Sequence, residues 1–302
     1  MRLLEVIQRS AAFLEERGVE SPRLQVEWLL ASVLRVPRLQ LYLQFERTLG
    51  DDQLAAIRDA VRRRGRREPL QHILGTAVFC GLELEVSRDA LVPRPETEIM
   101  AEQGWKWLAS RIASADPDPT RSWTALDWGT GTGCLALALA ANVPGSEVVA
   151  VDRSPAALAL ARRNGERLGL NGRIRWVESD GCAALEPVRT FDLVVSNPPY
   201  IPTGEIETLD PEVKDHDPRL ALDGGTDGLE VQRRLAVELA GRMRPGGRLL
   251  VEYGDEQGPG VAAVFSSSGW IVDALECDYS GRQRFLRARR PDGIPVDEPR
   301  AP

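Results

Sequence analysis

The first quarter of the chain carries hydrophobic residues at helical spacing. Apolar side chains recur every three or four positions in two runs, Leu3, Ile7, Ala11 and Leu14, then Val26, Leu29, Leu30 and Val33. Ser21 and Pro22 between them are typical of an N-cap followed by a first-turn proline. A shorter helix is predicted over 38–47 and another over about 51–67. Residues 1–73 are therefore predicted to form a small all-helical domain.

Beyond this region the period changes from helical to alternating. Apolar residues occupy every second position around Gly81, which predicts a β-hairpin from Val78, Cys80, Leu82, Leu84 and Val86. The stiff segment VPRPETE at 92–98 then leads into a helix expected to reach about Ser110, and a polar, proline-bearing loop occupies 113–120. We assign 74–95 to a hairpin and linker.

From Arg121 onward, strand-like and helix-like segments alternate. Strands are predicted at 123–128, 148–152, 173–178, 191–195, 247–253, 270–276 and 283–289. Helices are predicted near 133–142, 155–168, 228–241 and 258–267. This alternation is typical of an α/β fold with a doubly wound, mostly parallel sheet, here assigned to 96–289. Residues 290–302 are predicted to be a disordered tail.

Composition and charge narrow the class of protein. The 302 residues are 43% hydrophobic and 27% charged, which argues against wholesale disorder, and the net charge of −7 does not draw the whole molecule onto nucleic acid. The N-terminus is too charged for a secretory signal, and no apolar run is long enough to span a bilayer. Four scattered cysteines and two histidines argue against disulfides and metal sites. We expect a cytoplasmic protein without membrane contact.

A glycine-rich turn is the first candidate for chemistry. The run DWGTGTGC at 127–134 follows a predicted strand and opens an apolar helix, and its turn residues are Gly129, Thr130, Gly131, Thr132 and Gly133. Alternate glycines let the backbone approach a ligand closely, at the sheet edge where open α/β folds bind ligands. A purely structural turn is the alternative. A dinucleotide-binding turn requires glycine or alanine where Cys134 stands, and no GK[ST] follows for a phosphate loop.

Two carboxylates follow the next two predicted strands. Asp152 ends the strand 148–152 and can accept both ribose hydroxyls of an adenosine ligand. It can also cap the helix that begins at Ser154-Pro155, and both roles are compatible. Asp180 lies in the Ser179-Asp180-Gly181 segment after the third strand, where it can accept the exocyclic amine of adenine or serve as an ordinary loop residue.

The segment Asn197-Pro198-Pro199-Tyr200 follows the fourth predicted strand. Its two prolines fix two φ angles and drive the residues before them to extended geometry, so the segment forms a rigid bracket beside the glycine turn. The side-chain carbonyl of Asn197 and the backbone carbonyl of Pro198 can together accept both N–H bonds of a planar NH2 group, on which Tyr200 can pack. A proline-stiffened strand end without chemistry is the alternative.

Such a bracket suits methyl transfer to nitrogen. An amide or adenine nitrogen is a poor nucleophile because its lone pair is delocalised, and holding both its hydrogens on oxygen acceptors adds electron density and aims the nitrogen. If the neighbouring ligand is a sulfonium, its methyl carbon is the electrophile, and the reaction is an in-line displacement driven by positioning. This chemistry needs neither a metal ion nor a covalent enzyme intermediate.

The chain also resembles a known family. Three motifs are similar to those of class I S-adenosylmethionine-dependent methyltransferases that modify planar amide or amine nitrogens: DWGTGTGC, the VD at 151–152, and NPPY at 197–200. Two more segments, VPRPETE at 92–98 and DPRLALDGGTDGL at 217–229, together with the helical domain, resemble the bacterial release factor glutamine methyltransferases. The resemblance covers about residues 1–289.

The resemblance implies a Rossmann-like fold and a specific reaction. S-adenosylmethionine would be the methyl donor, and the acceptor would be the side-chain amide nitrogen of the GGQ-motif glutamine in peptide-chain release factors. Residues 129–133 would hold the methionine part of the cofactor, Asp152 its ribose, and Asp180 with Gly181 the adenine. The helical domain, 1–73, would recognise the release factor.

The same resemblance assigns the bracket. Asn197, Pro198 and Tyr200 would be the catalytic residues, Asn197 would also adjoin the cofactor, and Pro199 would help to bind the glutamine. Two positions depart from the family pattern. Gly181 stands where relatives can carry a bulky aromatic residue, and Trp128 stands where a small aliphatic residue is more usual.

Alternatives remain at this stage. The bracket can also hold a flipped adenine of a nucleic acid or a glutamine of a ribosomal protein, and a non-catalytic adaptor would use the helical domain alone. Five arginines between Arg62 and Arg67 suit an acidic partner or ribosomal RNA, but a solvated helix end is the simpler interpretation. Arg94 and Glu96 are further candidates for shaping the cofactor pocket.

Overall fold

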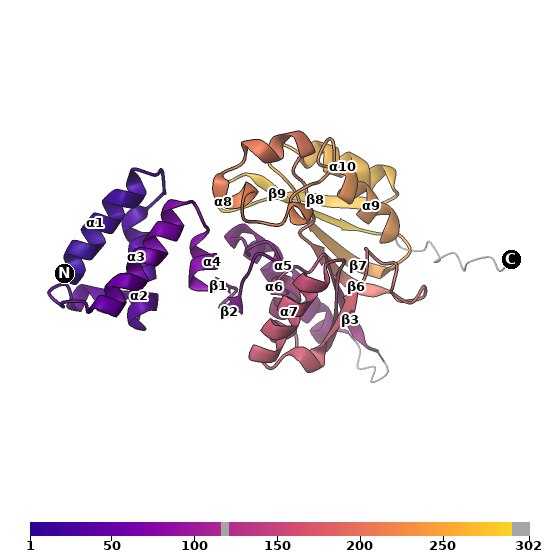
Figure 1. The fold of residues 1–302 in the computed structure, drawn as a ribbon. Helices are drawn as coiled ribbons and strands as arrows, with labels where there is room; N and C mark the ends of the chain where they lie inside the picture. Colours follow the sequence, from indigo (N-terminus) through magenta and orange to yellow (C-terminus); the bar gives the residue numbers. More distant parts are fainter. Residues whose placement is uncertain (116–120, 292–302) are drawn as a thin grey trace. The chain divides into compact units, whose positions relative to one another are not determined.

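The computed structural model describes residues 1–115 and 121–291, and these form two compact units (Figure 1). The helical unit comprises residues 1–76 together with 209–216, and the larger α/β unit comprises 77–208 and the residues from 217 onward. Most of the predicted disordered tail, from 292, lies outside the described residues, as does 116–120 of the predicted loop. In the described ranges no helix is long and apolar enough to cross a membrane.

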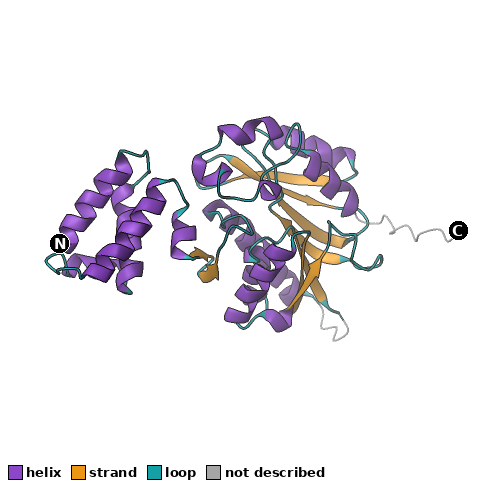
Figure 2. Ribbon diagram, in the orientation of Figure 1, coloured by secondary structure: helices purple, strands orange, loops and turns teal. Residues whose placement is uncertain are grey.

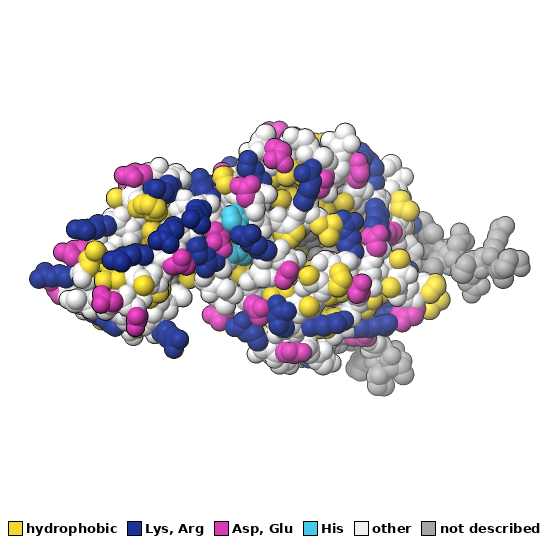
Figure 3. Space-filling model, in the orientation of Figure 1, with side chains coloured by type: hydrophobic (Ala, Val, Ile, Leu, Met, Phe, Trp, Pro, Cys, Tyr) yellow, Lys and Arg dark blue, Asp and Glu magenta, His cyan; other side chains and the backbone are white. Residues whose placement is uncertain are grey.

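The helical unit is built on the two predicted apolar runs. Its helices are α1 (Leu3–Glu15), α2 (Pro22–Leu34), α3 (Asp51–Gly65), α4 (Leu70–Leu74) and α8 (Pro211–Lys214), with a 3-10 helix η1 (Arg38–Leu43). The core joins the inner faces of the first three helices and includes Leu3, Ile7, Leu14, Val26, Leu29, Leu30 and Ile57. Within this unit, His72 and His216 lie with ring centroids 6.5 Å apart and are visible in cyan in Figure 3.

Two local predictions in this unit are wrong. The helix predicted over 38–47 is the six-residue 3-10 helix η1, because only Leu41 is buried and no apolar face supports a longer helix. Ser21 precedes α2 as predicted, but its hydroxyl makes no capping bond. A capping residue has extended backbone, whereas Ser21 has a left-handed φ of 48°.

The arginines near the end of α3 are bound mainly by carboxylates of their own chain. Arg62 pairs with Asp59 and Arg63 with Glu68, while Arg64 and Arg67 share Glu212 on α8. The interpretation as a solvated face is wrong for Arg64, which is 4% exposed. Burial by itself would raise the pKa of Glu212, but hydrogen bonds from Arg67 and Arg64 outweigh it and hold that pKa below its usual value.

The α/β unit contains the predicted doubly wound sheet. After the hairpin β1 (Thr76–Phe79) and β2 (Leu82–Glu85), the strands are β3 (Trp123–Trp128), β4 (Ser146–Asp152), β5 (Ile174–Glu178), β6 (Phe191–Ser196), β7 (Met243–Glu252), β8 (Ile271–Cys277) and β9 (Gln283–Arg289). Their order is β5-β4-β3-β6-β7-β9-β8, with the first five parallel and β9 antiparallel to both neighbours (Figure 2). The predicted fold class is therefore confirmed.

Helices cover both faces of this sheet. They are α5 (Pro95–Ser114), α6 (Cys134–Asn142), α7 (Pro155–Arg167), α9 (Glu230–Glu238) and α10 (Gly258–Ser267), with 3-10 turns η2 (Asn171–Arg173), η3 (Thr203–Thr208) and η4 (Arg219–Ala221). Alternate strand residues separate the two cores: Ala125 and Leu193 pack with α5 and α6, whereas Leu126 and Val194 pack with α9 and α10. The strand order reverses between β3 and β6, which places a crevice at their carboxyl ends.

Removal of the Glu212 carboxylate is expected to destabilise the helical unit. In Glu212→Ala, the buried Arg64 guanidinium loses a hydrogen bond of 2.7 Å, and leaving a buried charged donor unpaired costs roughly 1–3 kcal/mol. Urea unfolding followed by circular dichroism measures the loss. Glu207→Ala is the matched control, since Glu207 forms an exposed pair with Arg219 that should contribute less than about 1 kcal/mol. Equal stability of the two variants would contradict the assignment.

Candidate active site

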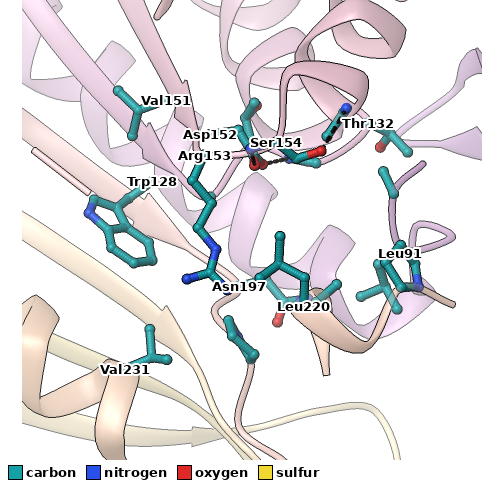
Figure 4. Close-up of a pocket in the computed structure, with 18 of the residues that line it drawn as sticks. Leu91, Trp128, Thr132, Val151, Asp152, Arg153, Ser154, Asn197, Leu220 and Val231 are labelled. Atoms are coloured by element: carbon teal, nitrogen blue, oxygen red, sulfur yellow. Dashed lines mark hydrogen bonds between the residues drawn. The ribbon is translucent and has the colours of Figure 1, made fainter. Parts of the chain in front are cut away.

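A cavity of about 330 Å³ lies at the carboxyl ends of the parallel strands of the α/β unit (Figure 4). Its wall contains the segments that follow β3, β4, β5 and β6, namely residues 129–132, 152–154, 179–181, Asn197 and Pro199. The linker before α5 and the segment around Leu220 complete the wall. The predicted site residues therefore converge on one place, although Gly133, Pro198 and Tyr200 do not line it.

The glycine turn is held by the neighbouring strand. The backbone N–H groups of Gly129 and Thr130 both donate to the carbonyl of Val151 at 2.9 Å, and that of Gly131 donates to Oδ2 of Asp152 at 2.8 Å. Gly131 and Gly133 have positive φ values of 55° and 84°, which other residues adopt only with strain. A Cβ on Gly133 would lie 3.1 Å from Ala161, so this glycine serves close helix packing.

Asp127 fixes the turn from inside. Its carboxyl group is fully buried and accepts hydrogen bonds from the Thr130 hydroxyl at 2.6 Å and from the Ala136 backbone at 3.0 Å. These bonds join the two ends of the turn, the strand end and the first turn of α6. Burial raises the pKa of Asp127 to about 7. Asp127 has no separate role among the predictions from the sequence, although a charged side chain that interrupts an apolar strand is a signal for one.

Ser154 caps the helix after β4, and Asp152 faces the glycine turn. The Ser154 hydroxyl accepts from the Ala157 backbone at 3.2 Å and so caps α7. Asp152 instead uses one carboxylate oxygen for the Ser154 backbone at 2.9 Å and the other for Gly131, and it lines the cavity. The carboxylate is thereby fixed in direction beside the turn, which is compatible with the predicted acceptance of ribose hydroxyls.

Asp180 and Gly181 both lie against side chains of α9. Arg234 donates to Oδ1 of Asp180 at 2.6 Å and to its backbone carbonyl at 2.7 Å, and this guanidinium holds the pKa of Asp180 below its usual value. An added Cβ on Gly181 would collide with Glu238 and Arg234. Trp128 also lines the cavity, and its ring centroid lies 5.8 Å from the Arg234 guanidinium.

The Asn-Pro-Pro-Tyr segment is anchored at both ends. The Ser196 hydroxyl donates to the carbonyl of Trp128 at 2.8 Å, which joins the end of β6 to the end of β3. At the far end, the carbonyl of Tyr200 accepts from Nε2 of Gln257 at 2.8 Å. Asn197, labelled in Figure 4, lines the cavity, and its Nδ2 donates to Oγ1 of Thr97 at 3.2 Å.

The two remaining sequence motifs brace this segment. In VPRPETE, Arg94 donates to the buried Asp217 of the second motif at 2.6 Å. In that second motif, the Leu222 carbonyl accepts from Ile201, and Gly224 leaves no room for a Cβ against the Tyr200 backbone. The cavity also uses linker residues that the sequence analysis missed, Asp89, Ala90, Leu91 and Pro93. In the sequence, the local sign that residues 89–93 have a restricted backbone is the pair of prolines, Pro93 and Pro95.

Comparison with known proteins agrees with this arrangement. The family model described as PrmC N-terminal domain matches residues 5–75, and the one described as methyltransferase small domain matches 102–210. A release factor glutamine methyltransferase from Geobacter sulfurreducens is 42% identical over 94% of this chain and 95% of its own. One from Deinococcus radiodurans is 42% identical over 97% of this chain and all of its own length.

The chain belongs to the release factor glutamine methyltransferase family. A solved methyltransferase from Pyrococcus furiosus shares the fold, with a TM-score of 0.51, 22% identity, and coverage of 75% of this chain and 97% of that one. For this family member, the sequence resemblance to class I methyltransferases is confirmed, and the nucleic-acid and adaptor alternatives are not favoured.

Alanine at Gly133 is expected to destabilise the α/β unit. The left-handed backbone costs a Cβ-bearing residue about 1–2 kcal/mol, and the new methyl group also crowds Ala161 at 3.1 Å. Gly172→Ala is the control, since a Cβ there meets no atom of the described residues within 4 Å, and it should change stability by less than about 0.5 kcal/mol. Thermal unfolding of both variants measures the difference; similar midpoints would contradict the packing role.

Replacement of Asp127 by asparagine is expected to flatten the pH dependence of stability. The carboxyl pKa is about 7 in the folded protein but about 3.9 in an unfolded chain. The folded state therefore binds more protons between these values. The contribution of the neutral carboxyl to stability is complete below about pH 4 and is lost as the pH rises through 7. Chemical denaturation of variant and parent at pH 5 and pH 8 tests this, and an identical difference at both pH values would contradict it.

Proposed function

We propose that this protein transfers the methyl group of S-adenosylmethionine to the side-chain amide nitrogen of the GGQ-motif glutamine of a peptide-chain release factor. Near-full-length identity of 42% to release factor glutamine methyltransferases supports the reaction and the substrate. The observation that carries the proposal is the juxtaposition of Asn197 with the glycine turn in one cavity. The family name favours a release factor over a ribosomal protein, and a substrate of translation is consistent with action in the cytoplasm.

The residues around the cavity fit the cofactor. The volume of about 330 Å³ lies within the range of small-molecule sites. Positions 129 and 131 carry no Cβ, which leaves the backbone open to a ligand, and Asp152 directs a fixed carboxylate to the same place. We assign residues 129–133 to the methionine part of S-adenosylmethionine. Gly133 contributes by allowing close packing against Ala161. When bound, S-adenosylmethionine supplies an electrophilic methyl carbon on sulfonium.

The adenine end of the site is assigned to Asp180 and Gly181. Both residues line the cavity, which supports the assignment. Because Arg234 already occupies Oδ1 of Asp180, only the remaining acceptor positions of that carboxylate can receive the adenine amine. The Arg234 contact orients the carboxylate and so determines which of its acceptor positions face the cavity.

The bracket is assigned to the substrate amide. Since Nδ2 of Asn197 donates to Thr97, Oδ1 is the atom left to accept a hydrogen from the glutamine amide, with the Pro198 carbonyl accepting the second. Two acceptors hold the NH2 group in one plane and direct the nitrogen toward the methyl carbon. Pro199 lines the cavity and bounds the amide, and Tyr200 packs on its face with its hydroxyl 3.4 Å from Glu252.

The two units have separate tasks in this proposal. Residues 96–289 bind the cofactor and perform the transfer, 74–95 form the hairpin and linker, and the helical domain, 1–73, recognises the release factor. The match of 5–75 to the family's N-terminal domain supports this division. A protein substrate is also consistent with the net charge of −7, since that charge gives no general attraction to nucleic acid.

Alanine at Asn197 is expected to reduce methyl transfer at least 10²-fold, because it removes one of the two acceptors that position the nitrogen. Cofactor affinity should change less than about threefold. Transfer is measured by mass spectrometry of a purified release factor after incubation with S-adenosylmethionine, and affinity by calorimetry. Asn142→Ala is the control, because that side chain donates locally to the Ala138 carbonyl at the end of α6 and does not line the cavity that the described residues form. Full activity of the Asn197 variant would reject its role.

A further inference from the structure

A chain of buried hydrogen bonds lies behind Asn197. Its Nδ2 donates to Oγ1 of Thr97 at 3.2 Å, and that hydroxyl donates to Oε2 of Glu252 at 2.6 Å. The other oxygen of Glu252 accepts from the Tyr200 hydroxyl at 3.4 Å. Thr97 and Glu252 are each 2% exposed. Three separate elements thus meet behind the bracket, α5 with Thr97, β7 with Glu252, and the segment after β6 with Asn197 and Tyr200.

The direction of these bonds is determined by the carboxyl group. An ionised carboxylate only accepts, so the single hydroxyl proton of Thr97 is directed to Glu252 and the hydroxyl oxygen is left to accept from Asn197. Burial raises the pKa of Glu252 to about 7. If Oε1 carries the proton, it faces Tyr200, and Oε2 remains an acceptor for Thr97. The bond to Tyr200 then reverses, but the order of donors and acceptors from Asn197 through Thr97 to Glu252 is the same in both states.

We propose that Thr97 and Glu252 are positioning residues that set the orientation of the Asn197 carboxamide. An asparagine side chain has two orientations that exchange its oxygen and nitrogen with little change in shape. With Thr97 as acceptor, Nδ2 lies on the Thr97 side and Oδ1 is presented to the substrate. In the reverse orientation, Nδ2 would meet the NH2 group of the substrate, and two donors would oppose each other.

This inference rests on the proposed function for its effect on turnover, but not for its effect on the carboxamide. A buried carboxyl group needs hydrogen-bond donors, and the Thr97 and Tyr200 hydroxyls that donate to Glu252 lie against residues 197–200 or belong to them. Two prolines fix the backbone of the bracket but not the Asn197 side chain. Thr97 and Glu252 fix the orientation of that side chain.

The carboxamide can be observed directly. The chain has four asparagines, Asn142, Asn164, Asn171 and Asn197, so selective 15N-asparagine labelling gives four side-chain NH2 signals. Asn197→Ala identifies the relevant one. In Thr97→Val, which keeps the shape but deletes the hydroxyl, we expect this signal to shift and its two protons to become more alike. Thr97→Ser should restore the parent signal. An unchanged Asn197 signal in Thr97→Val would overturn the proposal.

Kinetics of the full-length protein give the second measurement. Thr97→Val should lower kcat for release-factor methylation by between tenfold and about 10²-fold, the range expected for misplacing a reacting group by about 1 Å. The dissociation constant for S-adenosylmethionine should stay within about twofold, and Thr97→Ser should recover most of kcat. A parallel loss of cofactor affinity in Thr97→Val would assign Thr97 to the cofactor and overturn the proposal.

Thr124→Val is the matched control. Thr124 is also a buried threonine of the α/β unit, and its hydroxyl donates to the Thr190 carbonyl at 3.1 Å near the amino end of β3. It should change neither the Asn197 signal nor kcat. If the parent protein methylates no release factor but the signal responds to Thr97→Val, the proposed function fails and the positioning role stands. If methylation is normal and the signal does not respond, only the positioning role fails.

Discussion

The hydrogen bond from the Ser196 hydroxyl to the Trp128 carbonyl joins the two parts of the site. These residues are 68 positions apart in the sequence, and each is the last residue of its strand. Because β3 and β6 are parallel neighbours, both strands end at the same edge, and the side-chain bond fixes how the following segments leave it. The glycine turn and the Asn-Pro-Pro-Tyr bracket therefore begin from one common point. In the proposed function, this geometry sets the positions of the substrate nitrogen and of the methyl donor relative to each other.

Buried carboxyl groups support both segments that follow the Ser196–Trp128 bond, the glycine turn and the Asn-Pro-Pro-Tyr bracket. Asp127 and Glu252 each follow an apolar stretch of strand, each is almost fully buried, and each has its pKa raised to about 7 by that burial. Burial of such groups is unfavourable unless donors surround them. The donors are the Thr130 hydroxyl and the Ala136 backbone in one case, and the Thr97 and Tyr200 hydroxyls in the other. Each carboxyl group consequently holds the segment that faces the cavity.

Much of this arrangement could be predicted from the sequence because it is local. The strands, the hairpin and the order of motifs follow from hydrophobic period and from glycine and proline positions, and the sheet edge follows from the strand order. The predictions that are wrong concern features that tertiary contacts decide. The segment 38–47 has helix-forming residues, but its 3-10 helix buries only one side chain. Arg64 is predicted to be solvated because its partner, Glu212, lies far along the chain and is paired with it only in the folded structure. Thr97 and Glu252 carry no local signal of their joint role.

The two departures from the family pattern are connected through one arginine. A Cβ at Gly181 would meet the ends of the Glu238 and Arg234 side chains, and both would have to move to admit it. The same Arg234 binds Asp180 and lies 5.8 Å from the ring of Trp128. An aromatic residue at 181 and an arginine at 234 would compete for one volume, whereas an aromatic residue at 128 and the arginine can pack together. In this cavity wall the aromatic surface is therefore supplied by Trp128 at the end of β3, and the lack of a side chain at Gly181 leaves the Arg234 guanidinium in its place.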